Sequence, residues 1–151
     1  MKKFKFKLQS VLDARSKVLE NCQLAMAKVL HRLKQEQEHL DYLYTTVNIT
    51  KCDLENLLSS GNFIDLLSIN NHQGYIFKLK NDIINQHKII ADTEVELDAK
   101  KNEVLEALKA KTMLEKLKEK AQKEFKFNFE KLDLAEIDEI ATNRFKKVNF
   151  Y

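Results

Sequence analysis

The chain has 151 residues, of which 32% are charged and 44% are hydrophobic, and its formal net charge is +3. It contains no proline and two glycines, Gly61 and Gly74. Phosphate-binding loops of the Walker or dinucleotide type and nucleophile elbows need glycines at short fixed spacing, so these sites are excluded. A sheet protein also needs many glycine or proline turns, and their scarcity therefore favours a long helical protein.

Residues 8–58 are predicted to form a long amphipathic helix. Apolar residues recur at intervals of seven, and a second apolar stripe, interrupted by Arg15, Glu36 and Thr50, lies four positions before them. This a/d heptad pattern is typical of a coiled coil, and its strict period predicts a left-handed supercoil. The residues of the first stripe are Leu12, Leu19, Met26, Leu33, Leu40, Val47 and Leu54.

Two interpretations stay open for residues 1–10, at the start of this helix. Ser10 followed by Asp13 resembles a helix-capping pair. Phe4, Phe6 and Leu8 instead alternate with other residues, which is typical of an extended segment.

Residues 75–141 are predicted to form the second helix, with residues 59–74 as the bend and a short tail after 141. An earlier start, between about Phe63 and Tyr75, stays open, and Phe63–Ile69 can form a helical turn that caps the bend. The seven-residue apolar period holds up to Val104, and Lys111 occupies the next position. We interpret this change as a stutter, in which the apolar positions become Leu108, Leu114, Leu117, Ala121 and Phe125. The regular positions before the stutter are Ile69, Ile76, Ile83, Ile90, Leu97 and Val104.

Two matched heptad segments joined by one break predict an all-α fold, a long antiparallel two-helix coiled-coil hairpin that forms a single domain over residues 1–151. The alternative is one helix per chain paired with a second chain. Charge is distributed unevenly: residues 1–17 carry six basic groups and one acidic group, and residues 109–131 carry eight basic and four acidic groups. A hairpin brings these two basic segments side by side.

The sequence predicts no enzyme, cofactor or metal site. Cys22 and Cys52 lie thirty residues apart on one predicted helix, about 45 Å, too far to bridge or to share a metal. Paired carboxylates lie on exposed helix faces, and a two-helix coil offers no cleft to raise their pKa values. Lysines and phenylalanines alternate over Lys116–Lys131, but the interleaved glutamates fit a salt-bridged helix better than nucleic-acid binding. No apolar run is long enough to span a bilayer, so a cytoplasmic location is expected.

Surplus apolar residues gather late in the second predicted helix. Phe125, Phe129 and Leu132 share one helix face, and Phe127 and Leu134 share another. A two-helix hairpin buries only one stripe, so the second face predicts a partner protein. Local burial against Phe4 and Phe6 is the alternative.

Three segments resemble the FliJ family of flagellar export proteins. Lys3–Arg15 is similar to the family's amino-terminal signature, Lys111–Phe125 to its best-marked motif, and the sequence Asp138-Glu139-Ile140-Ala141 with Phe145 to its carboxy-terminal acidic motif. The break between Gly61 and Tyr75 also fits. The resemblance spans the whole chain.

The resemblance implies a non-enzymatic stalk of the flagellar type III export apparatus, similar in fold to the central stalk of rotary ATP synthases. The expected partners are the hexameric export ATPase ring, which the terminal end of the hairpin would enter and help to assemble, the cytoplasmic domain of the export gate protein FlhA, and export chaperones. The expected location is the cytoplasmic face of the membrane at the flagellar basal body. The residues expected at the ATPase end are Arg15, Lys111, Glu115, Leu117, Lys118 and Asp138 from the family motifs, with Phe125 and Phe127 from the surplus apolar surface.

Leu43, Tyr75 and Leu79 occupy positions comparable to the family's exposed apolar residues beside the bend, which implies binding to the export gate. The alternative is that Leu43 and Leu79 pack the hairpin. Other functions stay open: an injectisome stalk, a coiled-coil chaperone resembling prefoldin, or a structural coiled-coil dimer.

Overall fold

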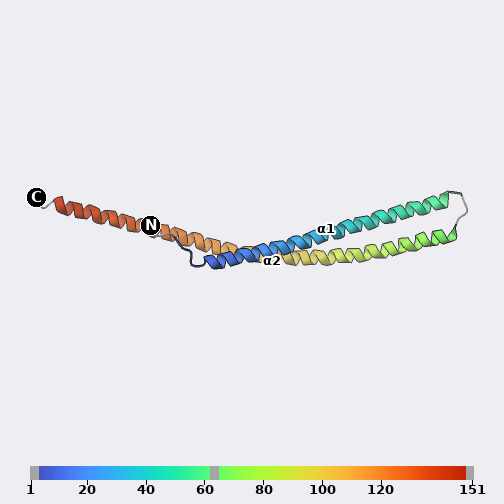
Figure 1. Ribbon diagram of the computed structural model, residues 1–151, viewed down its shortest axis with the longest axis horizontal. Coiled ribbons are helices and arrows are strands. Elements are labelled where there is room, and N and C mark those ends of the chain that lie inside the picture. Colours follow the sequence, from blue (N-terminus) through green and yellow to red (C-terminus); the bar gives the residue numbers. More distant parts are fainter. Residues whose placement is uncertain (1–3, 62–64, 149–151) are drawn as a thin grey trace. The chain divides into compact units, whose positions relative to one another are not determined.

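The computed structural model describes residues 4–61 and 65–148, and these residues form two α-helices (Figure 1). Helix α1 comprises Gln9–Ser59 and helix α2 comprises Leu66–Val148. The two helices pack against each other as a hairpin, and the described ranges contain no strand. The predicted all-α helical hairpin is therefore confirmed.

The hairpin is best described as two units, each of which contains a stretch of both helices. Unit 1 is Met1–Glu20 with Leu105–Tyr151, and unit 2 is Asn21–Val104. In unit 2, Val29 and Leu33 pack with Ile90 and Leu97 in one apolar cluster, and a second cluster lies nearer the connection between the helices. Later residues of α1 thus meet earlier residues of α2, as antiparallel packing requires. The second cluster contains Leu43, Val47, Leu79 and Ile83.

The heptad positions that the sequence predicts are the positions that the hairpin covers. Every residue of the two seven-residue series is buried or half-buried, from Leu12 to Leu54 on α1 and from Ile69 to Val104 on α2. None of the side chains among the described residues is covered completely, because each helix is covered along one stripe only. The core is therefore a narrow line of apolar contacts, which we call the heptad seam.

The seam continues past Val104 without a change of register, so the predicted stutter is wrong. Lys111 and Lys118, which follow Val104 at intervals of seven residues, are half-buried. Leu108 and Leu117, which the predicted stutter placed on the apolar stripe, are 45% and 50% exposed. Lysine can occupy a seam position because its aliphatic stem packs against apolar neighbours while its ammonium reaches the edge. The intervening seam positions are Ala107, Leu114 and Ala121, all half-buried.

Helix α2 differs at both ends from the range 75–141 suggested by the sequence. It begins at Leu66, where the Asp65 carboxylate accepts a hydrogen bond from the Leu67 amide at 3.1 Å. This cap satisfies one of the free amides of the first turn. Gly74 lies inside the helix, and Gly61, after the end of α1, has a positive φ of 65°, a conformation that glycine adopts readily. Residues 62–64, part of the predicted bend, lie outside the described residues.

The first described residues are not helical: residues 4–6 have no regular secondary structure, and residues 7–8 form a turn. Phe4 and Phe6 are half-buried, Lys5 and Lys7 between and after them are exposed, and α1 begins only at Gln9. The Gln9 amide donates to the Phe6 main-chain oxygen at 3.2 Å, which closes the turn into the helix. We call Phe4–Leu8 the N-terminal segment.

The end of α2 has no covering helix among the described residues. In Figure 1, the orange to red part of α2 has no part of α1 beside it. Every residue from Glu130 to Phe145 is exposed, although the helix itself continues to Val148. The side chains of this stretch are therefore available to a partner.

Candidate functional site

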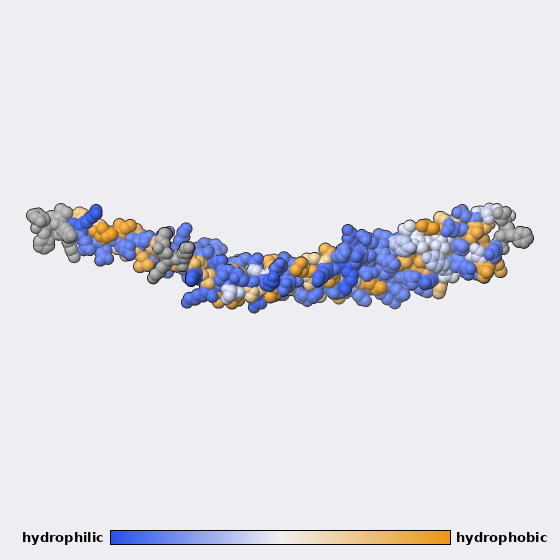
Figure 2. Space-filling model, in the orientation of Figure 1, coloured by the Kyte–Doolittle hydropathy of each residue, from blue (hydrophilic) through white to orange (hydrophobic). Residues whose placement is uncertain are grey.

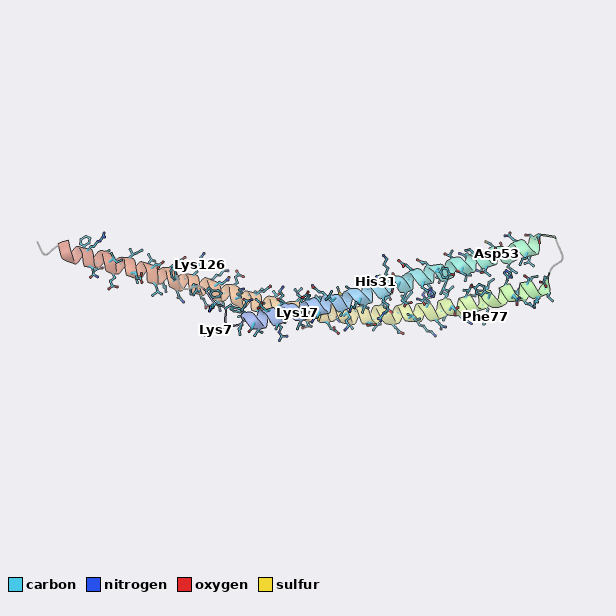
Figure 3. The ribbon with its side chains drawn as sticks, in the orientation of Figure 1. Lys7, Lys17, His31, Asp53, Phe77 and Lys126 are labelled. Atoms are coloured by element: carbon cyan, nitrogen blue, oxygen red, sulfur yellow. The ribbon has the colours of Figure 1, made fainter. Side chains whose placement is uncertain are left out.

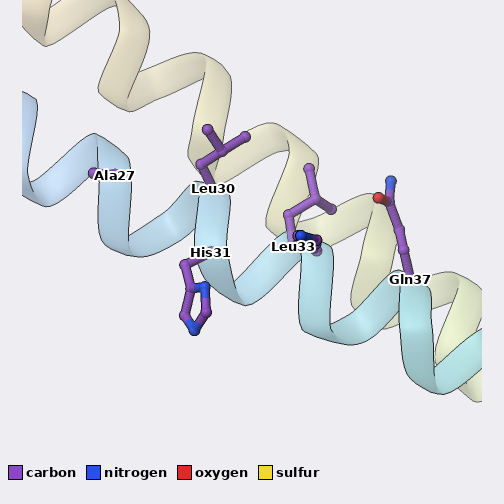
Figure 4. Close-up of a pocket in the computed structure, with 6 residues that line it drawn as sticks. Ala27, Leu30, His31, Leu33 and Gln37 are labelled. Atoms are coloured by element: carbon purple, nitrogen blue, oxygen red, sulfur yellow. The ribbon is translucent and has the colours of Figure 1, made fainter.

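No feature of the described residues resembles an enclosed catalytic or metal site. These residues contain no group of three or more histidine, cysteine or acidic side chains placed to hold a metal ion. One hollow, of about 520 Å³, lies on α1 alone, beside His31 and Leu33 (Figure 4). It is an open depression between the side chains of a single helix and is not a strong ligand site. The helices described here include none that is both long enough and apolar enough to cross a bilayer.

All eight residues that the sequence placed at the ATPase end belong to unit 1. Arg15 is exposed beside a shallow depression that Val11 and Val18 also line. Lys111 forms an ion pair with Glu115 at 3.6 Å, one turn along the same helix. Leu117 is 50% exposed and points away from the seam.

Lys118 is the one predicted residue whose polar contact joins the two helices of unit 1. Its ammonium donates a hydrogen bond to Gln9 Oε1 at 2.9 Å, across 109 positions of sequence. Sequence analysis did not identify Gln9. A glutamine next to the predicted start of a helix gives no signal by itself, and only the continued heptad register places Lys118 opposite it.

An aromatic cluster closes the seam of unit 1. The rings of Phe4 and Phe125 lie 5.6 Å apart between centroids, and those of Phe125 and Phe129 lie 6.5 Å apart. These separations are typical of favourable aromatic pairs. The N-terminal segment thus covers part of the Phe125 face, as the alternative of local burial expected, and Phe125 remains 36% exposed.

A second apolar face on α2 has no such cover. Phe127 follows Phe125 by two residues, about 200° around the helix, and therefore points away from the aromatic cluster. Leu134, Ile137 and Phe145 fall on the same side as Phe127. We call these four side chains the outer face. Their exposed fractions are 57% for Phe127, 61% for Leu134, 60% for Ile137 and 75% for Phe145.

Charged side chains lie within and beside the outer face, since Asp138 follows Phe127 by eleven residues, about 20° around the helix. The Lys131 ammonium lies 4.5 Å from the centre of the Phe127 ring, a cation–π contact. Asp138, predicted from the acidic motif, is exposed one residue after Ile137. Figure 2 shows apolar residues interspersed with polar ones along this end of α2. An apolar stripe with charged margins is typical of a helix that binds a protein partner.

The three residues predicted at the gate-binding end have different environments in unit 2. Leu43 and Leu79 are 5% and 4% exposed and belong to the same apolar cluster, so their side chains pack the hairpin. Tyr75 is 44% exposed, and Phe77 beside it is 67% exposed (Figure 3). Of the three predicted residues, Tyr75 is therefore the one with an exposed side chain. Phe77 is a second exposed aromatic residue beside it, which the sequence analysis did not identify.

The electrostatics of the described residues are those of an exposed helix surface. The hydrogen bond from Lys123 to Glu119, 2.7 Å long, together with the charge of that ammonium, lowers the pKa of the Glu119 carboxyl below its ordinary value. Both groups are exposed, so this pair contributes little to stability.

The fold and its exposed side chains define the class: a two-helix hairpin with large apolar side chains exposed along its helices. The family model for the flagellar FliJ protein matches residues 4–149 of the chain. The chain therefore belongs to the FliJ family, which indicates a component of flagellar export. Searches of curated proteins and of solved structures each returned no significant match.

Proposed function

We propose that this protein is a non-enzymatic stalk of the flagellar export apparatus, which enters the hexameric export ATPase ring through unit 1 and promotes assembly of the ring. The observation that supports this role is the outer face of α2. Its side chains are more than half exposed, and Phe145 is 75% exposed. A row of large apolar side chains on an uncovered helix favours burial against another protein.

The basic character of unit 1 adds to this proposal. Lysines occur on both of its chain segments, from Lys5 and Lys7 before α1 to Lys116, Lys118, Lys120 and Lys123 on α2. A basic surface beside an apolar one increases the rate of encounter with an acidic partner and orients it.

Unit 2 would contact the export gate, and the expected gate partner is the cytoplasmic domain of FlhA. Exposed Tyr75 and Phe77 are the side chains that we assign to this contact, because Leu43 and Leu79 are occupied by the hairpin core. Export chaperones are further proposed partners. In this role the protein acts in the cytoplasm at the inner face of the membrane, beneath the flagellar basal body.

Family membership favours the flagellar system over the injectisome alternative. A prefoldin-like chaperone needs strands to assemble its oligomer, and the described residues contain none. Light scattering distinguishes the alternative of a structural dimer from the stalk proposal. A dimer would have the mass of two chains, whereas the stalk proposal predicts the mass of one.

The direct test is steady-state ATP hydrolysis by the cognate export ATPase at a concentration where its ring is mostly dissociated. Addition of this protein should increase the rate, because a stalk that binds the assembled ring shifts the subunit equilibrium towards it. The matched variant Leu134→Ser/Phe145→Ser changes exposed residues only and should reduce the increase while leaving helicity unchanged. An unchanged rate with wild-type protein, together with no co-elution, would contradict the proposal.

A further inference from the structure

Unit 1 contains a groove that two separate parts of the sequence build together. It lies between the N-terminal segment and α2 and has a volume of about 450 Å³. The Phe4–Phe125 contact holds the N-terminal segment in place beside it. The groove combines two ammonium groups, two amides and two aromatic rings; its lining residues are Phe4, Lys5, Phe6, Gln9, Lys118 and Gln122.

Lys118 occupies an unusual position in this groove. It is a half-buried residue of the heptad seam, and its ammonium reaches the edge of the seam beside Gln9. Two other half-buried seam lysines have a carboxylate on their own helix: Lys111 pairs with Glu115 at 3.6 Å and Lys100 with Glu103 at 3.1 Å. Among the described residues, Lys118 has the neutral Gln9 amide as its partner and forms no ion pair.

A short chain of hydrogen bonds fixes the direction of the Lys118 ammonium. Gln9 Nε2 donates to the Asp13 carboxylate at 2.8 Å, which leaves Gln9 Oε1 to accept from Lys118. The Gln9 amide is thereby oriented, and one of the three ammonium donors is used. The other two donors remain for a further acceptor at the groove.

We propose that this groove binds one carboxylate of a partner protein, and that Lys118 and Lys5 are the residues that recognise it. The inference rests on the proposed function, in that the partner is the export ATPase and the carboxylate is an aspartate or glutamate side chain of its ring. Lys5 and Lys118 both line the groove, the Gln122 amide can supply a neutral donor, and half-buried Phe4 and Phe6 form apolar parts of its wall. A hydrogen bond between an ammonium and a carboxylate is charge-assisted and therefore stronger than one between neutral groups.

The test combines affinity with stability. Lys118→Met should weaken binding to the cognate ATPase by about tenfold to a hundredfold, as expected for loss of a charge-assisted hydrogen bond. The same substitution places an apolar side chain in the heptad seam, so the thermal midpoint of the free protein should stay the same or rise. A loss of affinity without a loss of stability separates recognition from unfolding.

Two matched variants serve as controls. Lys100→Met removes a half-buried seam lysine that has its own carboxylate, and Lys123→Met removes an exposed lysine of unit 1 that is paired with Glu119. Each should change the affinity less than about threefold, as exposed and internally paired lysines contribute little. Lys5→Met should weaken binding in the same direction as Lys118→Met.

Carbodiimide cross-linking identifies the acceptor directly, because it joins an ammonium only to a carboxylate in contact with it. In the complex with the ATPase, mass spectrometry should find Lys118 or Lys5 joined to an aspartate or glutamate of the ATPase, and Lys100 should give no such product. Wild-type affinity in Lys118→Met, or cross-links from other lysines alone, would overturn this inference and leave the stalk proposal intact. If the wild-type protein does not bind the ATPase at all, the proposed function itself fails.

Discussion

Gln86 donates a hydrogen bond from its amide Nε2 to the main-chain oxygen of Glu36, 3.0 Å away on the other helix of unit 2. The same amide nitrogen also contacts the Glu36 carboxylate. Glu36 interrupts the second apolar stripe of α1, and Gln86, 4% exposed, lies seven residues after Leu79 on α2. The polar interruptions of two separate stripes thus meet across the hairpin. A buried polar contact of this kind fixes the alignment of two helices better than it stabilises them.

Replacing both partners of this polar contact should therefore change stability and alignment in opposite directions. The double substitution Glu36→Leu/Gln86→Leu adds apolar surface to the seam and should raise the free energy of unfolding by about 1 kcal/mol. It should also permit alternative pairings, seen as dimers in light scattering or as extra amide signals by NMR. The control Gln73→Leu, at an exposed position of α2, should change stability by less than about 0.5 kcal/mol. A destabilised Glu36→Leu/Gln86→Leu variant would contradict this account.

The two kinds of residue predicted at the gate-binding end should respond differently to substitution. Leu79→Ala removes a side chain that is 4% exposed and should cost about 2–4 kcal/mol of unfolding free energy, measured by urea denaturation. Tyr75→Ala, where the side chain is 44% exposed, should cost less than about 1 kcal/mol. If Tyr75 contacts the gate, its variant should lose binding to the FlhA cytoplasmic domain while the hairpin stays folded. Retained binding by Tyr75→Ala and Phe77→Ala together would exclude this surface.

The N-terminal segment should be released by a single substitution. Phe4→Ala removes the ring that packs on Phe125 at 5.6 Å, a contact that contributes about 0.5–1.5 kcal/mol. Trypsin should then cleave after Lys5 and Lys7 about two to ten times faster than in the wild-type protein. Phe77→Ala, which replaces an exposed residue of unit 2, serves as the control and should leave this cleavage rate unchanged. Equal rates in all three proteins would show that the aromatic contact does not hold the segment.

The pKa of Glu119 should depend on Lys123. The hydrogen bond from Lys123 lowers this pKa in the folded protein, so Lys123→Met should raise it towards the ordinary value. Because the folded-state pKa is lowered, any contribution to stability is present above the pKa of the unfolded chain, about 4.3, and is lost as the pH falls through the folded-state value. Carboxyl carbon shifts in an NMR titration measure the pKa in both proteins. An identical titration midpoint would contradict the assigned cause.

The sequence predicted the hairpin because its physical basis is local and periodic. Residues from Leu12 to Val104 recur at the seven-residue interval that keeps one stripe facing a partner helix, and the structure covers these positions. The same argument failed after Val104, because it treated Lys111 as incompatible with a seam. Burial of a lysine stem with an exposed head depends on which residues lie opposite, and sequence spacing does not contain that information.

The candidate site was predictable only in part, for a similar reason. The surplus of apolar residues at Phe127 and Leu134 followed from helical spacing alone. The contact between Gln9 and Lys118, and the groove beside it, depend on where the N-terminal segment packs against α2. Neither alternative for the conformation of residues 1–10 specified the path of this segment along α2. At the other predicted site, Leu43 and Leu79 have the same residue type whether they pack the core or bind a partner, so only the antiparallel alignment of unit 2 distinguishes these roles.

The central claim is that this protein assembles the export ATPase ring, and mass photometry of the cognate ATPase tests it most directly. At a concentration where the ATPase alone is mainly monomeric, substoichiometric addition of this protein in the presence of nucleotide should produce particles with the mass of six ATPase subunits and one stalk. The Leu134→Ser/Phe145→Ser variant should produce fewer. An unchanged mass distribution with wild-type protein would contradict the stalk account.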